Sequence, residues 1–165
     1  MATGLALALP HRKVVCLDGD GSVLMELGQV ATLGQEAPAN LVVFVVDNGC
    51  YESIGWGDKG RRPTATSATA DLAAIAAGCG VPHTADVSTL DELDAQLAAA
   101  FDGVASGCRF VNVRTEPGHA QVPPRQTDGF EDKYRFVRYV EELEGKPILG
   151  LAKQDRALMR NPPTE

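Results

Sequence analysis

The stretch that decides the fold is Asp18–Tyr51, which reads DGDGSVLMELGQVATLGQEAPANLVVFVVDNGCY. An apolar run over Lys13–Asp18 leads into it and predicts a buried strand, and a second continuous apolar run, Leu41–Asp47, predicts another. Between them lie a tight Gly-Asp-Gly turn and the segment Val23–Gln35, whose apolar residues recur mostly at helical spacing. The stretch therefore predicts a strand–helix–strand unit with parallel strands and a right-handed crossover.

Polar residues stand at the end of both predicted strands. Asp20 lies in the turn after the first strand and Asn48 directly after the second. Because the carboxyl ends of parallel strands share one edge of a sheet, we expect these oxygen-bearing side chains to meet there and to suit a hard cation such as Mg²⁺. Ser22 is expected to open the helix, so that the N–H groups of Gly21, Ser22 and Val23 favour an anion beside the metal. The alternative is an ordinary turn, because these residue types are common in loops.

The rest of the chain alternates helical and strand-like segments. Ala2–Leu9 predicts a buried helix ended by Pro10, and Val14–Leu17 lacks polar alternation, which is typical of a strand covered on both faces. We expect further helices over 68–78, 90–101 and 131–144, with Ser88 and Asp91 capping the second, and strands over 81–85 and 109–114. This order predicts an α/β fold: a doubly wound parallel sheet with helices on both faces. We expect one domain over residues 1–145 and a C-terminal tail over 146–165.

Composition narrows the class of function. The chain has 165 residues, a net charge of −7 and 44% hydrophobic residues, which fits one globular domain. No run of Lys or Arg is longer than Arg61-Arg62, so nucleic acid is not an expected partner, and no apolar run reaches the roughly 20 residues that span a membrane. The four cysteines include no Cys-x-x-Cys pair, which disfavours a zinc site and indicates reduced, packed thiols in a cytoplasmic protein.

The segment Val14–Gly55 resembles a known motif. It begins VVCLDGDGSVLM and ends ANLVVFVVDNGCYESIG. A Gly-Asp-Gly followed by Asn about one strand–helix–strand unit later is similar to the diphosphate-binding motif of thiamine-diphosphate-dependent enzymes. The residues of this segment look most like those of the beta subunits of sulfopyruvate decarboxylases and those of phosphonopyruvate decarboxylases, and the resemblance covers most of the chain. It implies the thiamine-diphosphate-binding fold of the diphosphate (PP) type.

The same resemblance implies a cofactor and its ligands. Thiamine diphosphate would be held together with Mg²⁺, and the metal ligands would be the side chains of Asp20 and Asn48 and the backbone carbonyl of Cys50. The thiol of Cys50 is then interpreted as a bystander, because the loop needs its carbonyl and not its sulfur. The implied cofactor-binding residues are Gly19, Asp20, Gly21, Ser22, Asn48, Cys50, Tyr51 and Ile54.

Several neighbouring residues have two interpretations. Tyr51 and Ile54 either wall the cofactor or pack the loop, and Asp47 either caps the turn, which we favour, or contacts the diphosphate region. His119 follows the last strand and is a candidate active-site acid or base, although most loop histidines have no such role. Four arginines either neutralise an anionic substrate or are ordinary surface charges: Arg61, Arg62, Arg114 and Arg125.

The resemblance also implies a divided enzyme. The chain would be the diphosphate- and Mg²⁺-binding half, or beta subunit, of a thiamine-diphosphate-dependent 2-oxo acid decarboxylase, a carbon–carbon lyase. The catalytic glutamate would come from a pyrimidine-domain (alpha) subunit, so we expect no activity without that partner and a homo-oligomer in isolation. The alternatives are a non-catalytic or regulatory subunit and a fragment of a larger enzyme. An unrelated nucleotide-binding module is disfavoured, because neither G-x-G-x-x-G nor G-x₄-G-K-[ST] is present.

Overall fold

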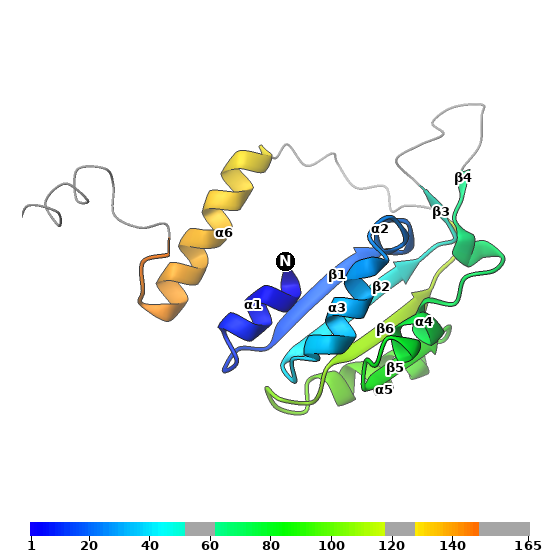
Figure 1. The fold of residues 1–165 in the computed structure, drawn as a ribbon, viewed down its shortest axis with the longest axis horizontal. Coiled ribbons are helices and arrows are strands. Elements are labelled where there is room, and N and C mark those ends of the chain that lie inside the picture. The colour runs from blue at the N-terminus through cyan, green and yellow to red at the C-terminus, as the bar shows by residue number, and fades with distance from the viewer. Residues whose placement is uncertain (52–61, 118–127, 149–165) are drawn as a thin grey trace, which may run out of the picture. The chain divides into compact units, whose positions relative to one another are not determined.

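Four parallel strands form the central sheet in the order β1–β2–β6–β5 (Figure 1). The computed structural model describes residues 1–51, 62–117 and 128–148, and the chain divides into two compact units, Met1–Ala120 and Gln121–Glu165. The sheet belongs to the first unit. Its strands are β1 (Val14–Gly19), β2 (Leu41–Asp47), β5 (His83–Val87) and β6 (Arg109–Arg114).

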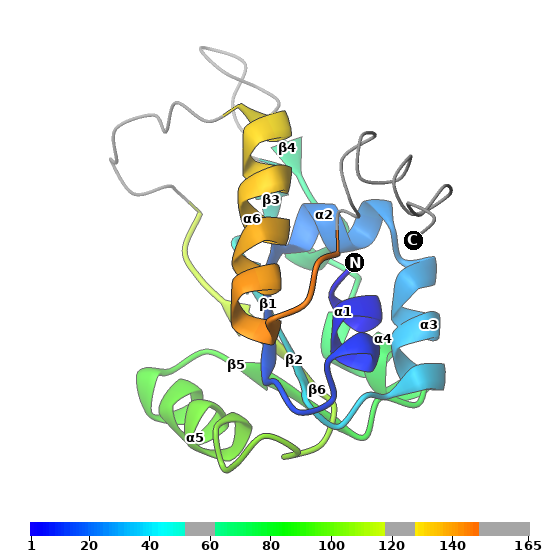
Figure 2. The same ribbon diagram turned by 90° about the vertical axis from the view of Figure 1, so that its left-hand side faces the viewer.

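Helices cover both faces of the sheet, as predicted (Figure 2). One face packs against α1 (Ala2–Ala8), α2 (Asp20–Met25), α3 (Gly28–Glu36) and α4 (Leu72–Gly78). The other face packs against α5 (Leu90–Ala100). The α/β class and the parallel sheet are therefore confirmed, because strands joined by crossover helices receive a helical layer on each side.

The two strands of the deciding stretch differ in burial. Six of the seven residues of β2 are buried, since it lies between β1 and β6. The expectation that the first strand is covered on both faces is wrong, because β1 lies at the sheet edge and Val15 and Leu17 are 41% and 74% exposed. The core cluster around α5 includes residues of β2, β5 and β6 but none of β1. The opening helix is likewise less buried than predicted, with Ala6 its only fully buried residue.

The predicted continuous helix over Val23–Gln35 is two helices. α2 begins at Asp20 and not at Ser22, and it ends at Met25, because the φ of −122° and ψ of 37° of the C-cap Glu26 leave the helical region. α3 resumes at Gly28 and places Val30 and Leu33 in the core. The break lets α2 present its first turn at the end of β1 while α3 covers the sheet.

Close backbone approach fixes how α3 meets α4. A Cβ atom on Gly34 would overlap the carbonyl of Cys79, which follows α4. Any larger residue would therefore push the two helices apart, because there is no flexible side chain that can move away.

Several boundaries in the second half are shifted from their predicted positions. The predicted helix over 68–78 begins later, at Leu72, because the side chain of Asp71 caps α4 by accepting from the N–H of Ala74. A short 3₁₀ turn, η1 (Ala65–Ser67), precedes it. The predicted Ser88–Asp91 capping pair is one residue off: Thr89 and Glu92 form a reciprocal capping box at the start of α5. The Glu92 carboxylate also accepts from the N–H of Ser88. This hydrogen bond, followed by those with Thr89, lowers the pKa of Glu92.

The amino-terminal edge of the sheet is held by one buried amide. The Nδ2 atom of Asn40, whose residue is 4% exposed, donates to the carbonyls of Ala6, Leu9 and Arg12 at 3.1, 3.0 and 2.7 Å. Asn40 thereby ties the end of α1 and the following turn to the start of β2. This anchor lies at the opposite end of the strands from the predicted site.

The second unit contributes one described helix, α6 (Gly129–Glu144), close to the predicted 131–144. Asp128 caps it by accepting from the N–H of Phe130, and Gly145 ends it with a φ of 60°. Among the described residues, no helix has the length and apolar character needed to cross a lipid bilayer. All four cysteines lie in the first unit, where Cys50 and Cys108 are buried and Cys16 and Cys79 are partly buried.

Candidate metal and diphosphate site

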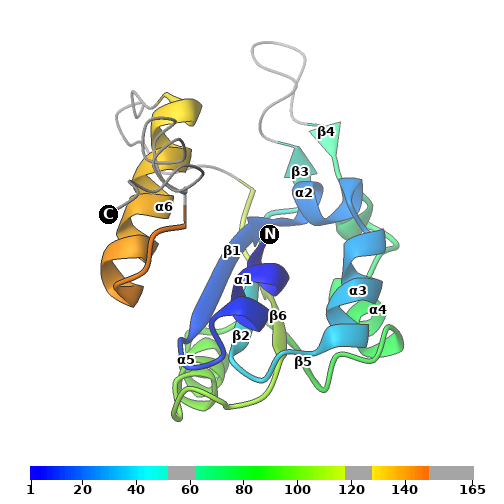
Figure 3. The ribbon, with the colours of Figure 1, turned by 60° about the vertical axis from the view of Figure 1, so that its left-hand side comes forward.

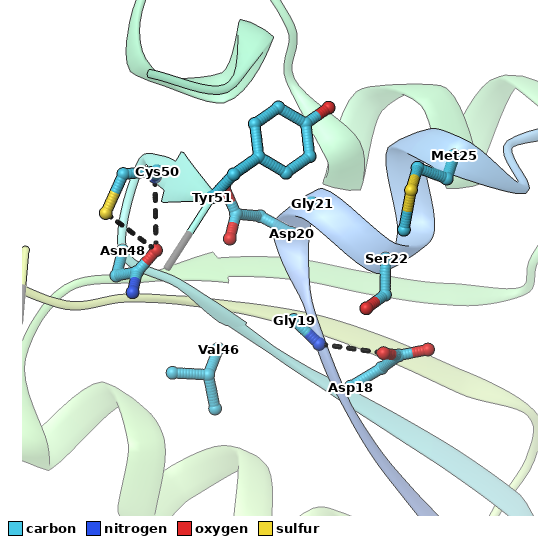
Figure 4. Close-up of a pocket in the computed structure, with 10 residues that line it drawn as sticks. All are labelled: Asp18, Gly19, Asp20, Gly21, Ser22, Met25, Val46, Asn48, Cys50 and Tyr51. Atoms are coloured by element: carbon cyan, nitrogen blue, oxygen red, sulfur yellow. Dashed lines mark hydrogen bonds between the residues drawn. The ribbon is translucent and has the colours of Figure 1, made fainter. Parts of the chain in front are cut away.

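The carboxyl ends of β1 and β2 form one pocket of about 370 Å³ (Figure 4). The strands are in parallel register, with Gly19 opposite Val46, so the residues that follow each strand lie side by side. Asp20 and Asn48 therefore meet at one edge of the sheet, which is the arrangement that the sequence predicts. The pocket is lined by Asp18, Gly19, Asp20, Gly21, Ser22, Met25, Val46, Asn48, Cys50 and Tyr51.

The turn after β2 is shaped by two side chains. The Oδ1 atom of Asn48 accepts from the N–H of Cys50 at 3.1 Å and from its thiol at 3.5 Å, as drawn in Figure 4. The Oδ1 atom of Asp47 accepts from the N–H of Gly49 at 3.2 Å, which confirms that Asp47 caps the turn. Gly49 has a φ of 68°, a conformation that favours glycine.

A small ribbon follows this turn and covers the start of α2. It pairs β3 (Cys50–Tyr51) with β4 (Arg62–Pro63) in antiparallel fashion, beyond the carboxyl ends of the main strands (Figure 3). A Cβ atom on Gly21 would lie 2.6 Å from the ring of Tyr51. Tyr51 therefore packs on the glycine turn and also lines the pocket, and its role as a wall of the cofactor site stays a prediction.

Asp20 is the most deeply buried carboxylate of the site, with 2% exposure. Its Oδ2 atom accepts from the hydroxyl of Thr64 at 2.6 Å and lies 3.0 Å from the hydroxyl of Thr66. Both contacts use the same oxygen, which leaves Oδ1 for another ligand.

The polar network continues across the sheet. The Nδ2 atom of Asn112, a residue that is 1% exposed, donates to Asp47 at 3.0 Å and to Asp86 at 2.8 Å. The Nε atom of Arg114 pairs with Asp86 at 2.7 Å, and this hydrogen bond, with the Coulomb attraction behind it, raises the pKa of the guanidinium. Arg114 therefore pairs with a neighbouring carboxylate through Nε, and its role towards a substrate anion stays a prediction.

Most of the predicted site residues are brought together. The pocket contains every implied cofactor-binding residue that the structure describes, and their roles as ligands stay predictions. Four residues that the sequence singled out lie outside the described residues: Ile54, Arg61, His119 and Arg125.

The sequence analysis missed the two threonines and Asn112. Thr64 and Thr66 lie between the segments for which the sequence predicts strands and helices, and they reach Asp20 across 44 and 46 residues. Their one local signal is a Thr-x-Thr directly after Pro63, where two small polar residues can be buried only with hydrogen-bond partners. Asn112 is the single polar residue inside the buried run of β6.

The ligand chemistry of the pocket fits Mg²⁺. The described residues include no cluster of three or more His, Cys, Asp and Glu side chains that could hold a metal. A transition-metal centre is therefore not indicated by that part of the chain, whereas one carboxylate, one amide oxygen and one backbone carbonyl form a hard oxygen set. In such a set the remaining positions are filled by water and by phosphate oxygens.

Comparison with known proteins shows the family. Residues 1–113 match the model of the thiamine pyrophosphate enzyme, C-terminal TPP binding domain. The chain is 36% identical over 138 residues to the sulfopyruvate decarboxylase subunit beta of Methanothermobacter thermautotrophicus. The aligned residues make up 83% of this chain and 68% of that protein. It is 44% identical over 115 residues to the phosphonopyruvate decarboxylase of Streptomyces viridochromogenes, which covers 70% of this chain but only 27% of that protein.

A solved structure agrees with the sequence relatives. The thiamine diphosphate-dependent 4-hydroxybenzoylformate decarboxylase of Rhodococcus jostii superposes with a TM-score of 0.56 at 26% identity, over 72% of this chain and 23% of that one. The chain thus spans about a quarter of the length of the larger enzymes and most of the length of the beta subunit. By its sequence, its fold and the position of its Gly-Asp-Gly turn, this chain belongs to the C-terminal TPP-binding domain family of thiamine pyrophosphate enzymes.

Proposed function

We propose that this chain is the diphosphate- and Mg²⁺-binding half of a thiamine-diphosphate-dependent 2-oxo acid decarboxylase. The observation that carries the proposal is the meeting of Asp20 with the Asn48–Cys50 turn in one pocket at the carboxyl edge of the sheet. The family match supports thiamine diphosphate as the cofactor, and the names of the relatives support decarboxylation of a 2-oxo acid that carries a sulfonate or phosphonate group.

Several residues of the pocket have a defined task in this proposal. Asp20, Asn48 and the carbonyl of Cys50 bind Mg²⁺, and the first turn of α2 faces the diphosphate with its backbone N–H groups. Gly19 leaves open space on the pocket side, because a Cβ atom there would meet nothing within 4 Å. When bound, the cofactor supplies the electron sink that allows a 2-oxo acid to lose carbon dioxide.

A second chain completes the site in this proposal. The described lining of the pocket comes only from the ends of β1 and β2 and the segments that directly follow them, and we expect a pyrimidine-domain chain to cover the remainder of the cofactor and to provide the catalytic glutamate. The similarity to a beta subunit over 68% of that subunit's length supports this division.

Two measurements test the proposal. Calorimetry should detect thiamine diphosphate binding to the purified chain in the presence of Mg²⁺ and no binding of ATP or NAD. Decarboxylation of sulfopyruvate and phosphonopyruvate should be absent for the isolated chain and appear on mixing with a pyrimidine-domain chain. Cofactor binding without activity in the mixture would favour a non-catalytic subunit, and absence of cofactor binding would refute the proposal.

A further inference from the structure

One hydroxyl group joins the two halves of the candidate metal site. The Oγ1 atom of Thr66 lies 3.0 Å from Oδ2 of Asp20, in the turn after β1. The same atom lies 2.7 Å from Oδ1 of Asp47, which caps the turn that carries Asn48. Thr66 is therefore the shared contact of two segments that are separated in the sequence and that each supply a predicted ligand.

Thr64, two residues before Thr66, contacts the same two segments. We call Thr64 and Thr66 together the threonine clamp. The hydroxyl of Thr64 donates to the same oxygen of Asp20 at 2.6 Å and lies 2.9 Å from the hydroxyl of Thr66. Its backbone N–H donates to the carbonyl of Gly49 at 3.0 Å, so the threonine segment also holds the ligand-bearing turn by its main chain. Both threonines are buried, with exposures of 3% and 7%.

We propose that Thr64 and Thr66 are positioning residues for the metal, which act through Asp20 and through the Asn48 turn. This inference rests on the proposed function, because it presumes that Asp20 is a ligand. The hydrogen bond from Thr64 and the contact with Thr66 both fall on Oδ2, so they fix the rotation of the carboxylate and leave Oδ1 for the metal. Groups that orient a metal ligand by hydrogen bonding typically change metal affinity by about 10- to 100-fold when they are removed.

The test compares two substitutions at one position with a matched control. Thr66→Val keeps the branched shape and removes the hydroxyl, whereas Thr66→Ser keeps the hydroxyl. Asn40→Ala is the control, since it also removes a buried polar side chain with three hydrogen bonds, at the opposite end of the strands. Calorimetric titration of the full chain with thiamine diphosphate at fixed Mg²⁺, and Mn²⁺ binding by electron paramagnetic resonance, give affinities that do not depend on turnover.

We expect Thr66→Val to weaken both affinities about 10- to 100-fold and Thr66→Ser to restore most of the loss. Asn40→Ala should lower the melting temperature without changing either affinity. Wild-type affinity in Thr66→Val, or an equal loss in Asn40→Ala, would overturn the inference and leave the proposed function intact. A wild-type chain that binds neither probe would overturn both. If Thr66→Val does not fold, Thr64→Val replaces it, because its hydroxyl contacts the same oxygen.

Discussion

Replacing Asp20 with asparagine separates the stability of the apo fold from the binding of the metal. The substitution preserves the shape of the side chain, so Thr64 and Thr66 can still donate to the oxygen that they now contact. The amide nitrogen then occupies the position of Oδ1 and cannot serve as a metal ligand. The fold and the site should therefore respond in different ways.

The expected change in apo stability is the difference between two terms. Thr66 lies 3.0 Å from Asp20 and 2.7 Å from Asp47, so the two carboxylate oxygens are at most about 6 Å apart, where unit charges repel by roughly 3 kcal/mol at an effective dielectric constant of about 20. Neutralising Asp20 removes this repulsion. The hydroxyl of Thr66 has one proton, which it gives either to Asp20 or to Asp47, so at most two charge-assisted hydrogen bonds to Asp20 become neutral ones, at about 1 kcal/mol each. We therefore expect the free energy of unfolding without metal to stay within about 1 kcal/mol of wild type.

With the cofactor present, the same variant should fall well below wild type. Ligand at 100 times its dissociation constant stabilises a native protein by about 2.7 kcal/mol, or roughly 10 °C for a unit of this size. Thermal unfolding followed by circular dichroism, in EDTA and in Mg²⁺ with thiamine diphosphate, should show that rise for wild type and none for Asp20→Asn. An equal rise in the variant would refute Asp20 as a ligand, and a loss of several kcal/mol in EDTA would refute the charge estimate.

Three further changes should give separable results. Asn48→Ala should abolish Mg²⁺-dependent cofactor binding, and unchanged calorimetric affinity would contradict this. It should also lower the free energy of unfolding by about 1 kcal/mol, because the Oδ1 atom of Asn48 accepts from the N–H of Cys50. Gly34→Ala should destabilise the fold by roughly 1–3 kcal/mol in urea unfolding, because the added Cβ overlaps the carbonyl of Cys79, and a neutral effect would show that α3 and α4 can separate. Burial raises the pKa of the Cys108 thiol from 9.0 to about 11. The contribution of this thiol to the free energy of unfolding should therefore be fully present below pH 9 and be lost as the pH rises towards 11. Cys108→Ala should remove that part of the slope, and parallel pH profiles would contradict the assignment.

The parallel sheet and the positions of Asp20 and Asn48 could be predicted, because each depends on the pattern of residues close together in the sequence. Apolar runs of strand length and a Gly-Asp-Gly turn place Asp20 and Asn48 at one edge whatever the details of the intervening helices. The break before Gly28 could not be predicted, since the apolar residues on both sides continue at helical spacing and only the tertiary packing decides between a long helix and two short ones. The exposure of Leu17 also depends on topology, because sequence cannot tell which strand lies at the edge.

The threonine clamp shows a different limit. Its contacts cross more than 40 residues and join side chains that look like ordinary loop residues in the sequence. Burial turns them into part of the site, because a buried hydroxyl must find a partner and the carboxylate of Asp20 is the acceptor within reach. Motifs mark the residues that contact a ligand, whereas the residues that orient those contacts are specified by the packing around them.

Charge explains why hydroxyl groups suit this orienting role. Along the described carboxyl edge of the sheet, the carboxylates of Asp20 and Asp47 are buried, and Arg114 is already paired with Asp86. A diphosphate placed beside Asp20 without a cation would be repelled, so in the proposed function Mg²⁺ is required for cofactor binding and does more than strengthen it. A lysine ammonium paired with Asp20 would instead cancel the negative charge that attracts the cation. A hydroxyl fixes the direction of the carboxylate and leaves its charge to the metal.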